Sequence, residues 1–275
     1  MMRALWAGAS GMKAEQTAVD NIANNLANVN TLGYKEQTAQ FKTLLYQNLQ
    51  AQTTTANGTN KPSSAQVGLG TRIASINASY TQGAQLESDN PMACCINGDG
   101  FFKVTGPDGL DYYTRSGDFL WATSNEEDRL VLTDPNGNPV LDQNNERIYL
   151  PENVSSNNVS VGTDGSIQYR DPSAENGFTD TGQKLALYQF PNTTGLEKTA
   201  NNLSATTISS GEALPEWETE NLIRSTIDQG YIEGSNVSIA DEMVSMIVSQ
   251  RAYESNSKSI TTSDSMLQTA NELKR

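Results

Sequence analysis

The chain has 275 residues, a formal net charge of −14, two cysteines and no histidine. This length suffices for one large or two modest domains. Most of the negative charge lies between residues 51 and 225, whereas the two ends are nearly neutral. The acidic composition argues against a nucleic-acid-binding protein, which needs a basic face, and the neutral ends suit burial against other protein.

The sequence contains no recognisable signal peptide or membrane span. Residues 1–12 hold no long apolar run, and no later window approaches the ~20 apolar residues that a spanning helix needs. We therefore expect no membrane span. If the protein leaves the cytoplasm, we expect a route that cleaves no recognisable leader.

Residues 1–31 carry the pattern of an amphipathic helix. Apolar side chains recur every seven residues, which is two helical turns, so they lie on one face. The small residues 8–11 offer a place where another backbone can approach closely, and Gly33 is predicted to end the helix. The seven-spaced set is Leu5, Met12, Val19 and Leu26, and Ile22 and Val29 fill a second position of the same repeat.

Four asparagines form a second stripe on this segment: Asn21, Asn24, Asn25 and Asn28. Asparagine is a poor helix former. Four of them within eight residues indicate that their amides have hydrogen-bond partners, which we expect on neighbouring chains.

Residues 34–80 are predicted to form a connecting segment with a polar extension. Residues 34–49 have no regular period. Residues 50–66 are rich in Thr, Ser and Asn, which is typical of a loop or flexible extension. Residues 67–80 alternate in the manner of a β-strand.

Residues 81–210 show short strand patterns interrupted by turn signals, which favours a compact, mostly antiparallel β domain. Cys94 and Cys95 are adjacent, so an unstrained disulfide between them is not expected, and two thiols do not make a zinc site. We interpret them as small, partly buried strand residues. The candidate strands are residues 96–104 (strand, turn, strand), 112–115, 129–132, 159–161, 166–169 and 184–190.

The last segment, residues 237–275, predicts one long helix of roughly 50 Å at 1.5 Å per residue. Ser238 followed by Asp241 resembles a helix cap with an acid in the first turn. Such a long, narrow apolar stripe requires a partner helix. The seven-spaced set is Ile239, Met246, Tyr253, Ile260 and Leu267, widened by Met243, Val244 and Ile247.

The order helix, β, helix predicts an α+β fold: paired amino- and carboxy-terminal long helices, coiled-coil-like, with an inserted, mostly antiparallel β domain. Apolar stripes at both ends of the chain favour assembly with other copies, and internal packing of a helical domain is the alternative. The predicted domains are residues 1–35 and 237–275 (terminal helical assembly domain), 36–80 and 211–236 (connecting region, with the polar extension at about 45–66) and 81–210 (outer β domain).

No catalytic, cofactor or metal site is predicted. The missing histidine removes the commonest general base and metal ligand. Residues 134–138 superficially resemble a calcium loop, but Pro139 and Asn145 stand where its Gly and bidentate Glu belong. Acidic pairs such as Asp108 and Asp111 arise by chance in a chain this acidic.

Five stretches in order resemble the bacterial flagellar rod and hook proteins. They are residues 24–35 (NNLANVNTLGYK), 97–102 (NGDGFF), 113–119 (YTRSGDF), 230–237 (GYIEGSNV) and 249–254 (SQRAYE). The match covers both ends and the start of the β region, whereas residues 120–217 match least.

The resemblance implies a structural protein that polymerises into a helical homopolymer of the flagellar basal body. It implies contacts with adjoining rod and hook proteins, and passage through the flagellar type III export apparatus without a cleaved signal peptide. The chain length fits a rod subunit better than the longer hook protein. The polar extension lies where a distal rod subunit carries an insertion associated with stiffness; a proximal rod or hook-type subunit is the alternative.

The resemblance also implies a rod that crosses the periplasmic space as a drive shaft. The alternative of another class is a secreted enzyme or binding domain that acts on cell-wall glycan through an acidic pair. The predicted assembly interface comprises Leu5, Met12, Val19, Ile22, Asn24, Asn25, Leu26, Asn28, Val29, Ile239, Met243, Met246, Ile247, Tyr253, Ile260 and Leu267.

Overall fold

The computed structural model describes residues 2–50, 64–124, 129–151, 154–171, 177–220 and 222–273. The chain forms two compact units, each assembled from separate stretches. Most of the predicted polar extension, residues 51–63, lies outside the described residues. The predicted connecting region is divided, because residues 37–78 belong to unit 1 and residues 211–236 to unit 2. Unit 1 is Met1–Ala27, Gln37–Ala78 and Ser238–Arg275, and unit 2 is Asn28–Glu36 and Ser79–Val237.

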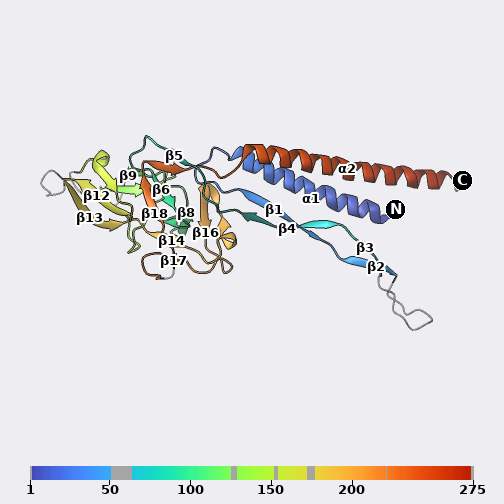
Figure 1. The fold of residues 1–275 in the computed structure, drawn as a ribbon, viewed down its shortest axis with the longest axis horizontal. Coiled ribbons are helices and arrows are strands. Elements are labelled where there is room, and N and C mark those ends of the chain that lie inside the picture. Colours follow the sequence, from blue (N-terminus) through green and yellow to red (C-terminus); the bar gives the residue numbers. More distant parts are fainter. Residues whose placement is uncertain are drawn as a thin grey trace, which may run out of the picture. The chain divides into compact units, whose positions relative to one another are not determined.

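Two long helices dominate unit 1 and lie side by side in opposite directions (Figure 1). They are α1 (Met2–Ala27) and α2 (Ile239–Glu272). The predicted start of α2 is confirmed, with Ser238 at the N-cap, although the Ser238 side chain makes no capping hydrogen bond. The prediction that Gly33 ends the first helix is wrong: α1 ends at Ala27. Gly33 instead occupies a left-handed turn with φ +66°.

Two antiparallel ribbons complete unit 1. β1 (Gln37–Thr43) pairs with β4 (Thr71–Ala78), and β2 (Tyr46–Gln50) pairs with β3 (Ala65–Gly68). The strand pattern predicted over residues 67–80 is confirmed. β1 and β2 were not predicted, because their apolar residues do not alternate.

Unit 2 is a β domain in which every strand pair is antiparallel, so the α+β class is confirmed. Its largest sheet has the strand order β15-β16-β8-β7-β14-β17. These strands are β15 (Glu197–Lys198), β16 (Leu203–Ala205), β8 (Asp111–Thr114), β7 (Phe101–Thr105), β14 (Leu187–Gln189) and β17 (Leu214–Pro215).

Unit 2 also contains smaller sheets. β18 pairs with β6, β19 with β5, β9 with β10, and β12 lies between β11 and β13. The short 3₁₀ turns are Ser156–Asn158, Thr193–Gly195 and Ala200–Asn202. The remaining strands are β5 (Gln85–Glu87), β6 (Cys94–Asn97), β9 (Leu120–Thr123), β10 (Leu130–Thr133), β11 (Val159–Val161), β12 (Ser166–Arg170), β13 (Phe178–Lys184), β18 (Thr226–Gln229) and β19 (Tyr231–Glu233).

The core of unit 2 has two apolar clusters on the two faces of β7. Successive side chains of a strand point to opposite faces, so Phe102 enters one cluster and Phe101 the other. Phe102 packs edge-on against Phe119 with ring centroids 4.9 Å apart, and Phe101 packs in the same way against Phe190 at 5.5 Å. Burial of these aromatic rings supplies a large part of the hydrophobic stabilisation of unit 2.

A buried ion cluster joins three distant parts of unit 2. Glu233 is only 1% exposed. Its Oε1 accepts a hydrogen bond from Lys35 Nζ at 2.6 Å, and its Oε2 accepts one from Arg115 Nε at 3.1 Å. Arg115 also donates to the carbonyl oxygens of Gly98 and Gly100, at 2.8 and 2.6 Å. Burial lowers the pKa of Lys35, an effect that the neighbouring Glu233 carboxylate opposes.

Cys94 and Cys95 lie in β6, so their predicted place in a strand is confirmed, although both are fully buried and not partly buried. Both are free thiols. Burial raises the pKa of Cys94 to about 12 and that of Cys95 to about 11. Since the thiolate is the reactive form, the folded protein holds both sulfurs in an unreactive state.

We predict that an aromatic disulfide reagent at pH 8 modifies neither thiol in the native protein and both in 8 M urea. The absorbance of the released thiolate measures the reaction. Modification of the native protein at the rate of the unfolded chain would show that β6 is accessible and contradict the burial of both thiols.

Candidate assembly interface

Small residues of α1 form the seam against α2. The buried residues of α1 recur every three or four positions, which places them on one helix face. A Cβ atom added to Gly8 would lie 3.0 Å from Ile260 Cγ1, and one added to Gly11 would lie 2.7 Å from Asn256 Nδ2. A Cβ atom at Gly8 would also lie 3.4 Å from the Asn256 carbonyl oxygen, so the expected close approach of another backbone is confirmed at Gly8. The buried set is Gly8, Gly11, Ala14, Ala18, Asn21, Ile22 and Asn25.

Asn25 joins both helices to the first strand of unit 1. Its Nδ2 donates to Glu242 Oε1 and to the Gln37 carbonyl oxygen, each at 2.8 Å, and its Oδ1 accepts from the Gln37 N–H at 3.0 Å. Asn21 Nδ2 donates to the same carbonyl oxygen at 2.6 Å. The expectation that these amides bind neighbouring chains is therefore wrong for Asn21 and Asn25, because their partners lie in the same chain.

The other two asparagines differ in position. Asn24 is exposed on α1, and Asn28 follows the helix in unit 2. Asn28 Oδ1 accepts a hydrogen bond from Thr31 Oγ1 at 3.1 Å. Of the predicted asparagine stripe, Asn24 alone is an exposed side chain on the helix surface.

The seven-spaced apolar stripe of α1 flanks the small-residue seam. Leu5, Met12, Val19 and Leu26 are each half-buried, whereas Ile22 lies in the seam itself. Val29 is half-buried beyond the end of the helix. The small residues occupy the interior because they allow the helix axes to approach, which leaves the larger side chains along the edge of the pair.

The corresponding stripe of α2 is only partly covered. Met246, Ile260 and Leu267 are half-buried, whereas Ile239 and Tyr253 are exposed. Exposed and half-buried members alternate over the first four positions of the stripe, so α1 covers part of it and leaves the rest at the surface.

Stripe residues of both helices meet at a shallow hollow of about 380 Å³. Val19 of α1 and Tyr253 of α2 line it together with Gln16, Gln250 and Glu254. The seven-spaced positions of the two helices thus reach the same side of the pair. This hollow contains no residue of the small-residue seam, so pairing of α1 with α2 leaves it open.

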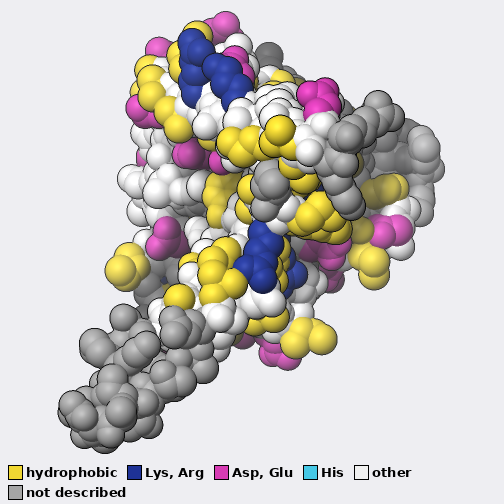
Figure 2. Space-filling view, turned by 90° about the vertical axis from the view of Figure 1, so that its right-hand side faces the viewer, with side chains coloured by type: hydrophobic (Ala, Val, Ile, Leu, Met, Phe, Trp, Pro, Cys, Tyr) yellow, Lys and Arg dark blue, Asp and Glu magenta, His cyan; other side chains and the backbone are white. Residues whose placement is uncertain are grey.

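The first three turns of α2 expose apolar side chains on several sides. Met243 is 53% exposed, Ile247 57% and Val248 63%. On α1, Met2 and Trp6 are exposed as well. Figure 2 shows one face of the molecule, on which apolar side chains lie at the surface among polar and charged ones. Exposed apolar side chains that gather in one segment mark an interaction site, and pairing with α1 leaves these uncovered.

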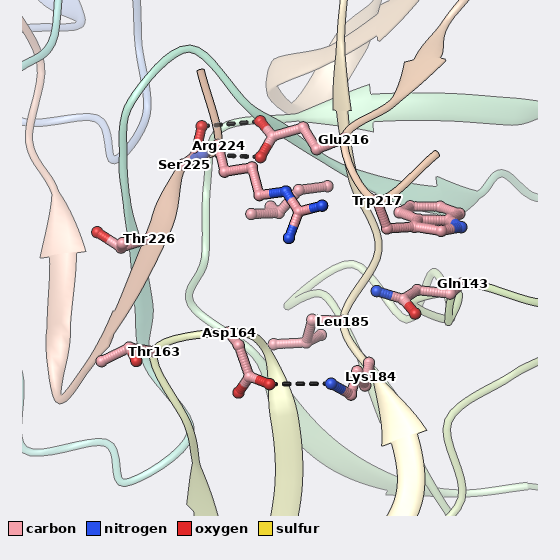
Figure 3. Close-up of a pocket in the computed structure, with 11 residues that line it drawn as sticks. Gln143, Thr163, Asp164, Lys184, Leu185, Glu216, Trp217, Arg224, Ser225 and Thr226 are labelled. Atoms are coloured by element: carbon pink, nitrogen blue, oxygen red, sulfur yellow. Dashed lines mark hydrogen bonds and ion pairs between the residues drawn. The ribbon is translucent and has the colours of Figure 1, made fainter. Parts of the chain in front are cut away.

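A separate hollow of about 380 Å³ in unit 2 gathers charged side chains (Figure 3). Asp164 accepts from Lys184 Nζ at 2.9 Å, and Glu216 accepts from the N–H and the hydroxyl of Ser225, each at 2.8 Å. The Ser166 hydroxyl and Lys184 hold the pKa of Asp164 well below its usual range. Asp164 is therefore unsuited to donate a proton as a general acid.

Across the described ranges, no cluster of three or more Cys, Asp or Glu side chains is placed to hold a metal ion. Among the helices described, none is long and apolar enough to cross a membrane.

We predict that Gly11→Leu separates α1 from α2. The leucine gains up to about 1 kcal/mol of helix propensity, but its side chain must displace Asn256, and such overpacking costs about 1–3 kcal/mol. The free energy of unfolding of the helix pair, followed by circular dichroism at 222 nm in urea, measures the net loss.

Ala9→Leu is the matched control, because Ala9 is exposed two positions away and its replacement should change stability by less than about 0.5 kcal/mol. Equal stability of the two variants would contradict the close packing at Gly11.

Three family models match the chain along its length. The model described as "Flagella basal body rod protein" matches residues 5–35. "Flagellar hook protein FlgE/F/G D1 domain" matches residues 95–169, and "Flagellar basal body rod FlgEFG protein C-terminal" matches residues 228–273. The matched ranges contain residues 5–27 of α1, much of unit 2 and all of α2.

Full-length relatives agree with these matches. The chain is 43% identical over 280 residues to the flagellar basal-body rod protein FlgG of Borreliella burgdorferi, with all of both chains covered. It is 37% identical over 278 residues to FlgG of Bacillus subtilis, again with all of both chains covered. Identity to the flagellar hook-basal body complex protein FlhP of the same bacterium is 28%, with 97% of each chain covered. The chain belongs to the flagellar basal-body rod protein family.

Proposed function

We propose that this protein is a non-enzymatic, self-assembling subunit of the distal rod, the part of the flagellar drive shaft that transmits torque to the hook. One observation carries the proposal: pairing of α1 with α2 leaves the apolar first turns of α2 and the hollow between Val19 and Tyr253 exposed. Each large apolar side chain that assembly removes from water contributes about 1.5–3 kcal/mol when fully buried.

We infer two kinds of contact along the helix pair. The small-residue seam and Asn25 hold α1 to α2 within one chain in a coiled-coil-like pair. The half-buried and exposed residues then meet neighbouring copies in a helical homopolymer. The inter-subunit set is Leu5, Met12, Val19, Asn24, Leu26, Ile239, Met243, Ile247 and Tyr253, whereas Ile22, Asn25 and Ile260 belong to the contacts within the chain.

The relatives' names support a rod subunit, since FlgG is named a basal-body rod protein in two matches that cover all of both chains. A subunit of the proximal rod or a hook-type protein is the alternative within the family. We infer that the assembled rod crosses the periplasmic space and contacts adjoining rod and hook proteins. We also infer that the chain reaches its site unfolded through the flagellar export apparatus, without cleavage of a leader.

We predict that Ile247→Asp abolishes polymerisation and leaves the monomer folded. Ile247 is 57% exposed in the helix pair, so a charge there costs the monomer little, but it becomes a buried unpaired charge between subunits. Sedimentation of purified subunits and motility of cells that carry the variant measure assembly. Thr262→Asp, at an exposed polar position of the same helix, should polymerise normally; if Ile247→Asp also polymerises normally, the inter-subunit assignment fails.

Ile260→Asp should behave differently, because Ile260 packs against Gly8 within the chain. We expect it to loosen the helix pair and block polymerisation, while the near-ultraviolet circular dichroism of unit 2 stays unchanged. A monomer with wild-type helix stability would place Ile260 outside the seam.

A further inference from the structure

The carboxy-terminal part of unit 2 pairs and packs with segments from earlier in that unit. β18 pairs with β6 and β19 with β5, so the last two strands complete sheets begun about 140 residues earlier. Ile227 is 1% exposed in the main apolar cluster. The side chain of Gln229 accepts from the Val161 N–H at 2.9 Å and donates to the Pro91 carbonyl oxygen at 2.6 Å.

Glu233 supplies the only carboxylate that pairs with Lys35 or Arg115 among the described residues. The two cations are 2% and 3% exposed. Removing one member of a buried charge group leaves an uncompensated charge, which destabilises a fold strongly. If the segments around Lys35 and Arg115 folded before Glu233 was in place, they would therefore bury two positive charges with no counter-charge.

Glu233 also satisfies backbone groups of two earlier segments. Its Oε1 accepts from the Gly83 N–H at 2.9 Å, and its carbonyl oxygen accepts from the Gly33 N–H at 2.8 Å. Three residues later, Asn236 Oδ1 accepts from the Glu36 N–H at 2.7 Å, and its Nδ2 donates to the Ser79 carbonyl oxygen at 2.9 Å. The same short segment thus ties residues 28–36 to residues 79–84.

Two other ion pairs in the described part of unit 2 do not have this property. Lys103 pairs with Asp111 and Lys184 with Asp164, and each acid of these pairs is at least half exposed. Their partners lie within 20 residues of each other, so these pairs form without the end of the chain. In contrast to these two pairs, the cluster around Glu233 is buried and depends on the last strand of unit 2.

We propose that residues 225–237 act as a closing latch: unit 2 cannot complete its core until Glu233 neutralises Lys35 and Arg115. The biological role of the latch rests on the proposed function, because the latch would keep the β domain unfolded while the chain is exported. The latch itself is a property of the monomer, so it succeeds or fails independently of polymerisation.

The test uses the full-length monomer and native-state amide hydrogen exchange. The probes are the amides of Leu132 and Val140, which donate to Ile148 and Leu132 in the core, and that of Ile227 in β18. In the Glu233→Gln variant we expect the protection of Leu132 and Val140 to fall by at least about a hundredfold, together with that of Ile227. A loss confined to Ile227, Gly33 and Gly83 would overturn the latch and leave Glu233 with a local structural role.

Two further variants separate charge from shape. Asp228→Asn removes a half-buried carboxylate from the same segment. Among the hydrogen bonds described, Asp228 accepts only from Gln85 Nε2, at 3.3 Å. We expect the exchange protection of Leu132 and Val140 in this variant to stay within about threefold of the wild-type value. Adding Lys35→Met to Glu233→Gln removes one of the two uncompensated cations. The protection of Leu132 and Val140 in this double variant should be at least about tenfold higher than in Glu233→Gln alone. Absence of this rescue overturns the electrostatic basis of the latch.

Discussion

Unit 2 depends on one carboxylate, Glu233, held between Lys35 and Arg115 in a site closed to water. A buried ion pair adds little net stability compared with apolar residues of the same volume, since desolvation of the charges offsets their attraction. We interpret its effect as one on specificity. Arg115 also donates to two carbonyl oxygens of the turn before β7, and Lys35 donates to the Thr81 carbonyl oxygen at 2.6 Å, so this arrangement satisfies the charges and the backbone acceptors together.

Unit 1 depends on the close approach of α1 and α2 instead of on a buried ion cluster. Gly8 and Gly11 let α2 contact the backbone of α1, and the helix propensity lost at two glycines, about 1 kcal/mol each, is offset by this packing. The consequence is functional. Because small residues fill the seam, the larger side chains of both helices remain at the edge, where a neighbouring subunit can bury them.

The sequence predicted features that depend on local periodicity. The start of α2 followed from Ser238 and Asp241, its length followed from the seven-residue spacing, and the strand, turn, strand pattern of residues 96–104 followed from the residue types there. It did not predict which stripe residues are covered by α1, because a seven-residue spacing does not show that the small residues Gly8 and Gly11 form the contact with α2. β18 and β19 were missed because they are short and carry charged residues.

The buried role of Glu233 had no local signal at all. Its partners Lys35 and Arg115 lie 198 and 118 positions away, and a lone Glu in a short polar segment normally lies at the surface. Asn25 presents the same difficulty, since its partner Glu242 is 217 positions away. The asparagine stripe indicated that amide partners exist, but only the fold identifies them as residues of the same chain.

These long separations bear on when each unit can form. Contacts between distant residues slow folding, because the intervening chain must be ordered before the contact stabilises it. An isolated helix with one narrow apolar stripe is marginal in water, so α1 gains its order from α2 at the other end of the chain. The inter-subunit face that we propose therefore requires the contact between Asn25 and Glu242. Until that contact forms, the apolar residues of the two ends have no fixed geometry, and the chain cannot present the proposed polymerisation surface.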